Sequence, residues 1–310
     1  MSADKTLTWT YTEEFPLEEE AATQARLRGM GLGVEPVSVA TGAALRVLAA
    51  SVGAKSIAEI GTGTGVSGLW LLGGMGRDGV LTTIDVESEL QREARRAFDA
   101  AGYPSSRIRL IQGRASAVMP RMAARSYDMV VLDVDPVEAA NLAEGALRML
   151  RVGGVLAVTH ALWADHVADP ARRDPATVAA RELAKAVRAS DLLVCTLLPV
   201  GDGLLVAVRR GCARHARHDP GPAGARPREL RRTTRHPGAA PLPTRLRRAR
   251  AHVPGDEPAP AAPRHTQARP GARPGRDGGR DRRRDGCYCT PITKAGFETL
   301  FHTGEDASRP

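Results

Sequence analysis

The stretch Ala58-Glu59-Ile60-Gly61-Thr62-Gly63-Thr64-Gly65-Val66-Ser67 indicates the fold of this 310-residue chain. A short apolar run leads into three alternating glycines and then into a helical pattern, so the backbone turns sharply between a strand and a helix. Glycines in such a turn let a nucleotide-like ligand approach the backbone closely. A dinucleotide-binding loop, G-x-G-x-x-G, needs a third glycine at position 66, which is Val66; the spacing here is G-x-G-x-G.

Short apolar runs alternate with longer helical patterns around this loop. Strands are predicted at residues 56–60, 80–84, 108–112, 129–133 and 155–159, and helices between them at 65–72, 88–101, 115–122 and 136–150. This alternation is typical of an α/β fold. It predicts a Rossmann-like, doubly wound sheet of mostly parallel strands with helices on both faces.

The end of this region breaks the alternation. After a predicted helix at 176–189, two strand-like runs at 192–199 and 203–208 are joined by three residues, a connection too short for a parallel crossover. The last of the seven strands is therefore expected to run antiparallel to its neighbour. Two helices predicted at 18–28 and 37–52 precede the sheet and are expected to cover one end of it.

An acidic residue, Asp85, ends the second predicted strand, some twenty residues after the glycine loop. A carboxylate at that strand end can accept hydrogen bonds from both hydroxyls of a ribose. Nicotinamide dinucleotides and S-adenosylmethionine both carry such a ribose. Asp85 by itself therefore predicts a nucleotide-like ligand without distinguishing between these two.

The basic charge of the chain lies in its last hundred residues. The net charge is +9, yet residues 1–210 hold 23 basic and 25 acidic side chains, whereas residues 211–310 hold 21 and 10. The last hundred also contain 14 of the 22 prolines and only eight Leu, Ile, Val or Phe, too few to bury a core. We therefore expect an N-terminal segment and helix at 1–35, a globular domain at 36–210 and a disordered extension at 211–310.

The extension is rich in Arg, Pro, Gly and Ala. A basic tail can bind nucleic acid, but the interleaved aromatic residues that stack on bases are missing here, so nucleic acid is not the expected partner. GC-rich DNA read in a shifted frame encodes the same residue types. We interpret the tail as a frameshift product or an unselected extension. Cys287 and Cys289 have no second pair, so zinc is not expected.

The sequence predicts neither a membrane span nor an export signal. No apolar run reaches the length of a membrane span, and the N-terminus lacks a basic segment followed by an apolar one. Cys195 is the one cysteine among residues 1–210, which fits a reducing compartment. We expect a cytoplasmic protein without contact to a membrane.

Four of these segments together resemble class I S-adenosylmethionine-dependent methyltransferases: the glycine loop, Asp85, Gly113-Arg114-Ala115, and residues 127–133. More narrowly, residues 31–210 are similar to the small O-methyltransferases related to catechol and caffeoyl-CoA O-methyltransferases, in their actinobacterial branch. The resemblance implies an enzyme that transfers a methyl group from S-adenosylmethionine to a hydroxyl of a small acceptor, which is expected to be aromatic. Family members are commonly dimers, so the resemblance also implies a possible homodimer.

The resemblance carries a cofactor site over to this chain. Glu59, Gly61 and Thr62 match contacts to the methionine end of the cofactor, where backbone amides and a carboxylate meet the amino-acid moiety. Ser67 matches a hydroxyl that reaches the same moiety. The cofactor residues that it implies are Val37, Glu59, Gly61, Thr62, Ser67, Asp85 and Ala115.

The other positions lie on different elements. Asp85 matches the ribose carboxylate, and Ala115 matches a residue that lines the adenine pocket. Val37, expected at the start of the helix at 37–52, matches a residue that packs on the cofactor. Asp133 ends the fourth strand, where open α/β sheets hold their substrates, and is the expected acceptor-binding residue.

One part of the family pattern is missing. Metal-dependent relatives hold a divalent cation with an Asp at the end of the fourth strand, an Asp-Asn pair at the end of the fifth, and a nearby lysine. Asp133 matches the first Asp, but the pair falls on Thr159-His160 and the lysine position is Pro136. One carboxylate is a poor site for an oxygen-preferring cation, so no metal ligand is assigned and an obligatory metal is not expected.

His160 is then the candidate catalytic residue. The ordinary pKa of histidine lies near neutrality, which suits a general base that removes the proton of the acceptor hydroxyl. A residue that only lines the cleft is the other interpretation. Two alternatives to the methyltransferase remain open: a catalytically impaired cofactor-binding protein, because of Thr159, His160 and Pro136, and a nicotinamide-dependent oxidoreductase, which Val66 disfavours.

Overall fold

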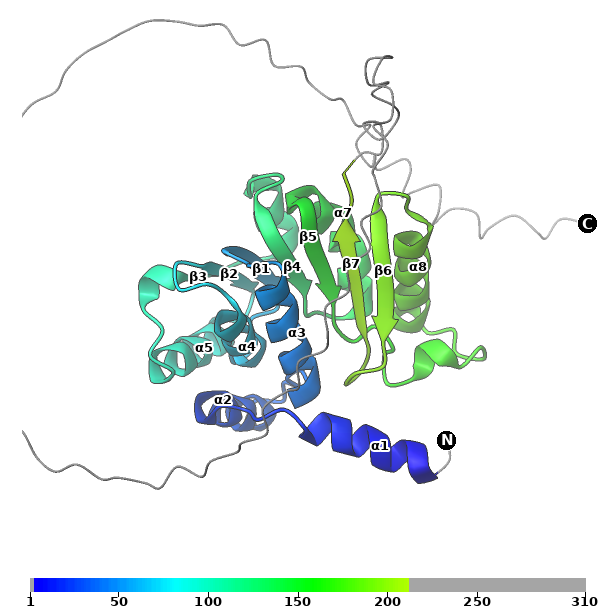
Figure 1. Ribbon diagram of the computed structural model, residues 1–310, viewed down its shortest axis with the longest axis horizontal. Helices are drawn as coiled ribbons and strands as arrows, with labels where there is room; N and C mark the ends of the chain where they lie inside the picture. The colour runs from blue at the N-terminus through cyan, green and yellow to red at the C-terminus, as the bar shows by residue number, and fades with distance from the viewer. Residues whose placement is uncertain (1–2, 212–310) are drawn as a thin grey trace, which may run out of the picture. The chain divides into compact units, whose positions relative to one another are not determined.

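The computed structural model describes residues 3–211 and centres on one seven-stranded sheet (Figure 1). The strand order is β3-β2-β1-β4-β5-β7-β6. Neighbouring strands from β3 to β5 pair in parallel, and β7 lies between β5 and β6 and is antiparallel to both. The strands are β1 (Ser56–Ile60), β2 (Val80–Asp85), β3 (Ile108–Gln112), β4 (Tyr127–Leu132), β5 (Leu150–Val158), β6 (Leu193–Leu198) and β7 (Leu204–Arg209). The predicted doubly wound fold with an antiparallel last strand is confirmed.

Helices cover both faces of this sheet. The α-helices are α1 (Ala3–Glu14), α2 (Glu20–Gly31), α3 (Val39–Ser51), α4 (Val66–Gly74), α5 (Ser88–Ala100), α6 (Ala115–Val118), α7 (Pro136–Met149) and α8 (Pro175–Ala189). Three 3-10 turns, η1 (Ser105–Arg107), η2 (Met119–Arg121) and η3 (His166–Ala168), complete the elements of the described residues. In Figure 1, α3, α4 and α5 lie on one side of the sheet, and α7 and α8 lie on the other.

Two apolar cores result from this layering. Met129 and Val131 of β4 point into the core under α3, α4 and α5, whereas Val130 and Leu132 point into the core under α7 and α8. All four side chains are fully buried, which explains why β4 is a continuous apolar run rather than an alternating one. Helices thus cover both faces of the central strands. A ligand can reach the sheet only at the edge where the strands end.

The structure differs from the sequence-based prediction in several elements. The helix α1 was not predicted. The helix expected at 115–122 is divided into α6 and η2, because Pro120 cannot continue an α-helix. The strand β5 begins five residues before the predicted position, and its register against β4 shifts between Tyr127 and Met129.

Helices α1 and α2 lie below the sheet in Figure 1, at the end toward which β4 and β5 run. Ala22 and Ala25 of α2 belong to the same core as α3, α4 and α5, so the expected boundary at residue 36 does not separate two cores. None of the described helices is long and apolar enough to cross a membrane. The predicted disordered extension, apart from residue 211, lies outside the described residues.

Candidate active site

The glycine loop joins β1 to α4 at the carboxyl end of the sheet. Gly61, Gly63 and Gly65 all have positive φ angles, of 91°, 50° and 91°, which glycine adopts without a steric penalty. A Cβ atom on Gly61 would overlap the carbonyl oxygen of Asp133, the residue that follows β4. The loop therefore needs glycine both for its conformation and for its close approach to the end of β4.

Asp85, at the end of β2, fixes this loop. Its Oδ2 atom accepts hydrogen bonds from the backbone N–H groups of Thr62, at 2.9 Å, and Gly63, at 3.0 Å. Its Oδ1 atom accepts one from the N–H of Glu87 at 2.9 Å. The carboxylate predicted to bind a ribose is thus already oriented toward the glycine loop.

A cavity of about 240 Å³ lies above this loop. The predicted cofactor residues on its wall are Val37, Gly61, Thr62, Ser67 and Asp85, and Asp133 and His160 line it as well. Sequence reasoning missed other lining residues, namely Val34, Glu35, Pro36, Gly63, Thr64, Val66, Leu90, Val134, Asp135 and Glu138. Most of these are neighbours of predicted residues along the chain, but Leu90 of α5 reaches the cavity only because of the fold.

Two predicted cofactor residues are not part of this wall. Glu59 is fully buried in β1, and Ala115 is 3% exposed and packs in the core under α7 and α8. Burial raises the pKa of Glu59 to about 8, and the charges of Asp133 and Asp85 add to the increase. The hydroxyls of Thr83 and Ser67 oppose it, although neither carboxyl oxygen has a hydrogen bond of normal geometry. At neutral pH Glu59 is therefore a protonated, uncharged acid behind the cavity.

Val37 does not begin a helix, contrary to the prediction. Ser38 is the N-cap, its hydroxyl accepts a hydrogen bond from the N–H of Thr41, and α3 begins at Val39. The cause is the serine, whose side chain satisfies a free N–H group at the helix start. Val37 is nevertheless buried at the cavity wall, and its carbonyl oxygen accepts a hydrogen bond from Arg26 Nη1 at 2.6 Å.

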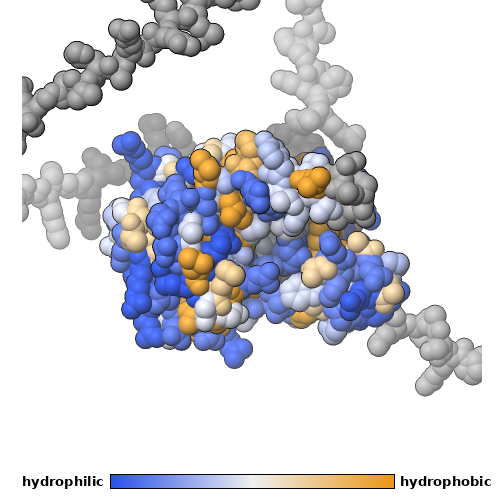
Figure 2. Space-filling view, turned by 90° about the horizontal axis from the view of Figure 1, so that it is seen from below, coloured by the Kyte–Doolittle hydropathy of each residue, from blue (hydrophilic) through white to orange (hydrophobic). Residues whose placement is uncertain are grey.

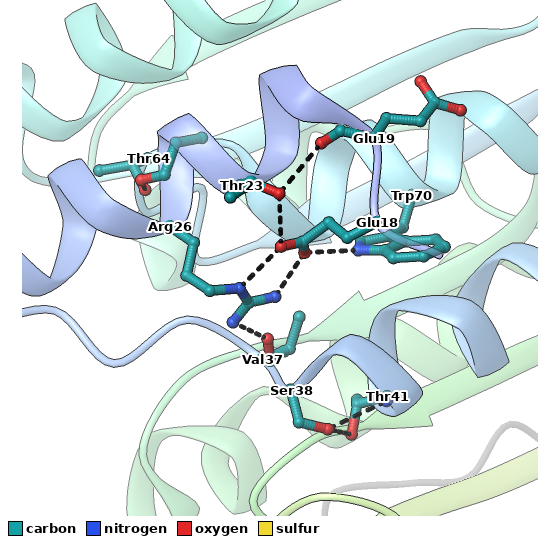
Figure 3. Close-up of polar contacts among 10 residues, drawn as sticks. Glu18, Glu19, Thr23, Arg26, Val37, Ser38, Thr41, Thr64 and Trp70 are labelled. Atoms are coloured by element: carbon teal, nitrogen blue, oxygen red, sulfur yellow. Dashed lines mark hydrogen bonds and ion pairs between the residues drawn. The ribbon is translucent and has the colours of Figure 1, made fainter. Parts of the chain in front are cut away.

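Figure 3 shows how this segment is held by α2. Arg26 donates from Nε and Nη2 to the two carboxylate oxygens of Glu18, at 3.1 Å and 2.7 Å. The same carboxylate accepts hydrogen bonds from Trp70 Nε1 and from the hydroxyl of Thr23. The hydrogen bond from Arg26 thus positions the backbone of Val37. Because Glu18 neutralises Arg26, this contact adds no net charge beside the cavity.

His160, which follows β5, lies between two carboxylates. Its Nε2 atom is 3.4 Å from Asp133 Oδ1, and its Nδ1 atom is 3.1 Å from Asp202 Oδ2. Hydrogen bonds to Asp133 and Asp202 raise the pKa of His160 to about 10, more than burial lowers it. The ordinary pKa assumed from the sequence therefore does not hold, and at neutral pH the ring is a cation rather than a free base.

The residues after β5 have an unusual backbone. His160, Trp163, Ala164 and Asp165 all have positive φ angles, between 49° and 63°, which residues with a Cβ atom rarely adopt. Several contacts hold this segment. Asp202 Oδ1 accepts a hydrogen bond from the N–H of Ala164, the backbone oxygen of Asp202 accepts one from the N–H of Leu162, and the Trp163 ring stands edge-on to His160. Such strain is often found at functional sites, where surrounding contacts maintain it.

The residues at this strand end do not fit a divalent cation. Thr159 donates its hydroxyl proton to Asp133 Oδ1 at 2.6 Å, and both ring nitrogens of His160 face carboxylates. Asp135 caps α7, since its Oδ1 accepts from the N–H groups of Val137 and Glu138. Within residues 3–211, no group of three or more His, Cys, Asp or Glu side chains is arranged to hold a metal ion.

A second, larger cavity of about 740 Å³ shares His160, Val37, Pro36 and Glu35 with the first. Its wall comes from segments far apart in the sequence: Thr6 and Trp9 of α1, Met30 of α2, the residues after β5, and the turn between β6 and β7. Figure 2 views the molecule from the α1 and α2 side, where hydrophobic residues lie among hydrophilic ones. His160 lines both cavities, and Asp133, which lines the first, is 3.4 Å from it.

Comparison with known proteins gives a consistent result. A family model described as O-methyltransferase matches residues 12–210. A Mycobacterium tuberculosis protein named probable O-methyltransferase is 46% identical over 201 residues, which are 65% of this chain and 90% of that protein. A solved structure from Corynebacterium glutamicum is 34% identical, with a TM-score of 0.63, over 69% of this chain and 100% of that one. The O-methyltransferase TomG from Streptomyces achromogenes, solved in complex with SAM, is 24% identical and supports the fold, with a TM-score of 0.61 over 68% of this chain and 100% of that one.

Proposed function

Because the chain belongs to the O-methyltransferase family, we propose that it transfers the methyl group of S-adenosylmethionine to a hydroxyl of a small, aromatic acceptor. The observation that carries this proposal is the juxtaposition of two cavities at His160, one over the glycine loop and one under α1. A donor in the first cavity and an acceptor in the second would meet beside Asp133.

The first cavity suits the donor. The ribose hydroxyls would bind Asp85, whose carboxylate is already fixed by the loop, and the amino-acid end would lie along Gly61, Thr62 and Ser67. Val37 would pack on the cofactor from the opposite wall. Glu59 and Ala115 are buried behind the wall and would not contact the cofactor. The carboxyl group of Glu59 could ionise when the cationic amino group of the cofactor approaches.

Bound S-adenosylmethionine supplies a methyl group on a sulfonium, a leaving group that is already activated. The residues of this chain then have to orient the acceptor oxygen and take its proton. Among the described residues, Asp133 Oδ1 is occupied by Thr159 and His160, whereas Oδ2 makes no hydrogen bond. Asp133 Oδ2 is the proposed proton acceptor.

His160 is catalytic in this proposal as a cation. As the oxygen–methyl bond forms and the methyl–sulfur bond breaks, the acceptor proton passes to Asp133 and the sulfonium becomes a neutral thioether. Both ring nitrogens of His160 face carboxylates, so the imidazolium would act on negative charge at the acceptor oxygen through its positive charge, and Asp202 holds the ring in place. No step of this proposal uses a divalent cation, because Thr159, His160 and Pro136 supply no carboxylate ligand.

The test combines binding and turnover on the full-length protein. Calorimetry should show binding of S-adenosylhomocysteine and none of NAD. A panel of catechols and phenols with S-adenosylmethionine should yield methyl ethers at equal rates with Mg²⁺ and with a chelator. Tight NAD binding, or none of S-adenosylhomocysteine, would overturn the proposal; binding without any methyl transfer would favour an impaired cofactor-binding protein.

We extend the proposal to the whole chain. Residues 36–210 and the N-terminal segment 1–35 form the catalytic unit. The enzyme is cytoplasmic and forms a homodimer. Light scattering of the purified protein tests the dimer. A mass of one chain at micromolar concentration would refute it.

A further inference from the structure

The helix α1 lies against the acceptor side of the site, although sequence reasoning did not predict it. We infer that α1 is a working part of the acceptor site, in which Trp9 forms the aromatic wall against the acceptor and Glu13 positions the loop that carries Asp202. This inference rests on the proposed function. Most of α1, including Trp9, precedes residue 12, at which the match to the family model begins.

Trp9 and His160 line the same cavity. Trp9 is 47% exposed, so its ring is accessible to a ligand rather than packed into a core. Other apolar residues on the wall include Met30, Leu162 and Pro199. Polar and charged residues, among them Thr159, His160 and Asp202, lie with them. A planar acceptor fits such a cavity with its ring against Trp9 and its hydroxyl toward His160.

Glu13 connects α1 to the catalytic histidine. Its Oε1 atom accepts a hydrogen bond from the backbone N–H of Gly201 at 2.7 Å. Gly201 precedes Asp202, whose carboxylate holds both His160 and the N–H of Ala164. A Cβ atom on Gly201 would overlap the hydroxyls of Ser38 and Thr41, so the turn that carries Asp202 lies close to the start of α3 as well as to α1.

Such a connection matters because α1 is short. A helix of 12 residues is marginal in water unless tertiary contacts hold it. Leu7 and Tyr11 of α1, and Phe15 of the following loop, are exposed and add little burial, so the contact with α3 and the bond from Gly201 help to hold the helix over the cavity. Glu13 is therefore a positioning residue, and Trp9 sets acceptor specificity.

The test for Trp9 compares two aromatic residues of one helix. We expect Trp9→Ala to raise KM for the best acceptor of the phenol and catechol panel about tenfold, with affinity for S-adenosylhomocysteine unchanged. Trp9→Phe should retain most of the affinity. Tyr11→Ala is the matched control, since Tyr11 is 68% exposed and does not line the cavity, and it should change neither value.

The test for Glu13 compares neighbouring carboxylates. Glu13→Ala should lower kcat about tenfold without changing the melting temperature or the affinity for S-adenosylhomocysteine. Glu13→Gln keeps an oxygen that can accept from Gly201 and should restore kcat. Glu14→Ala, an exposed neighbour, is the control and should behave as the wild type.

Acceptor binding, measured by calorimetry with S-adenosylhomocysteine present, separates this inference from the proposed function. Methyl transfer that Trp9→Ala and Glu13→Ala leave unchanged would overturn the inference alone. Acceptor binding that depends on Trp9, without methyl transfer by the wild type, would overturn the proposed function alone. If no panel member is bound or methylated, both are overturned.

Discussion

His160 Nε2 lies 3.4 Å from Asp133 Oδ1, and this contact joins the ends of β5 and β4 across the site. A histidine with its ordinary pKa would be mostly a neutral base at physiological pH. Here two carboxylates keep the ring charged, and the proposed function therefore gives the proton-accepting role to Asp133 Oδ2. The consequences can be measured.

The first prediction concerns the titration of His160. Its pKa, raised from 6.5 to about 10, means that its stabilising effect is fully present below pH 6.5 and is lost as the pH rises through 10. NMR of the imidazole should show a charged ring at neutral pH, and Asp202→Asn should lower its pKa. A wild-type ring that titrates near its ordinary pKa would contradict the arrangement.

The second prediction concerns the buried acid Glu59. Because its pKa is raised from 4.5 to about 8, the folded protein holds this proton more tightly than the unfolded chain, and stability falls as the pH rises through that interval. Glu59→Gln keeps the shape without the charge. We expect it to melt above the wild type at about pH 9 and close to it at about pH 4. If Glu59→Gln and the wild type melt at the same temperature at about pH 4 and also at about pH 9, ionisation of Glu59 does not destabilise the fold. The control is Glu14→Gln, at an exposed position.

The third prediction concerns Asp85. Asp85→Ala removes the partner of the Thr62 and Gly63 N–H groups as well as the proposed ribose ligand. Affinity for S-adenosylhomocysteine should fall at least about tenfold in calorimetry. Asp99→Ala, at an exposed position on α5, should leave it unchanged. Unaltered affinity in Asp85→Ala would refute the ribose assignment.

The fourth prediction separates backbone strain from steric overlap. Gly33 has a φ angle of 75°, and a Cβ atom added there would have open space around it, so Gly33→Ala should cost about 1 kcal/mol of stability. Gly61→Ala adds the overlap with Asp133 and should cost about 3 kcal/mol or more. Urea unfolding of both variants measures the difference. Similar losses would mean that the end of β4 moves away easily.

The fifth prediction concerns the basic extension. If it is a frameshift product or an unselected addition, a chain that ends at Gly211 should bind S-adenosylhomocysteine and turn over acceptors as the full chain does. Resequencing the gene tests the origin directly. An intact reading frame at the codons for residues 210–212, with natural protein of the full mass, would refute the frameshift.

The fold could be predicted from the sequence alone. Three alternating glycines between an apolar strand and a helix allow few backbone paths, and β4 reads as a buried strand because both of its faces are covered. The connection before the last strand, three residues in the prediction and five in the structure (199–203), is too short for a parallel crossover, and the strand is antiparallel, as observed. The predicted positions Val37, Gly61, Thr62, Ser67 and Asp85 came together at one cavity because parallel strands end at the same edge.

The ionisation states and the acceptor side, in contrast, follow from the tertiary structure. His160 is charged because two carboxylates face its ring: Asp202, 42 residues later in the chain, and Asp133, 27 residues earlier. No local sequence pattern predicts contacts between residues so far apart. Glu59 is uncharged because the sheet buries it completely. The place of α1 beside His160 rests on its contact with α3 and on the hydrogen bond between Glu13 and Gly201, which lies 188 residues away in the chain. Periodicity and spacing describe neighbours along the chain, whereas these contacts exist only once the sheet has brought distant segments together.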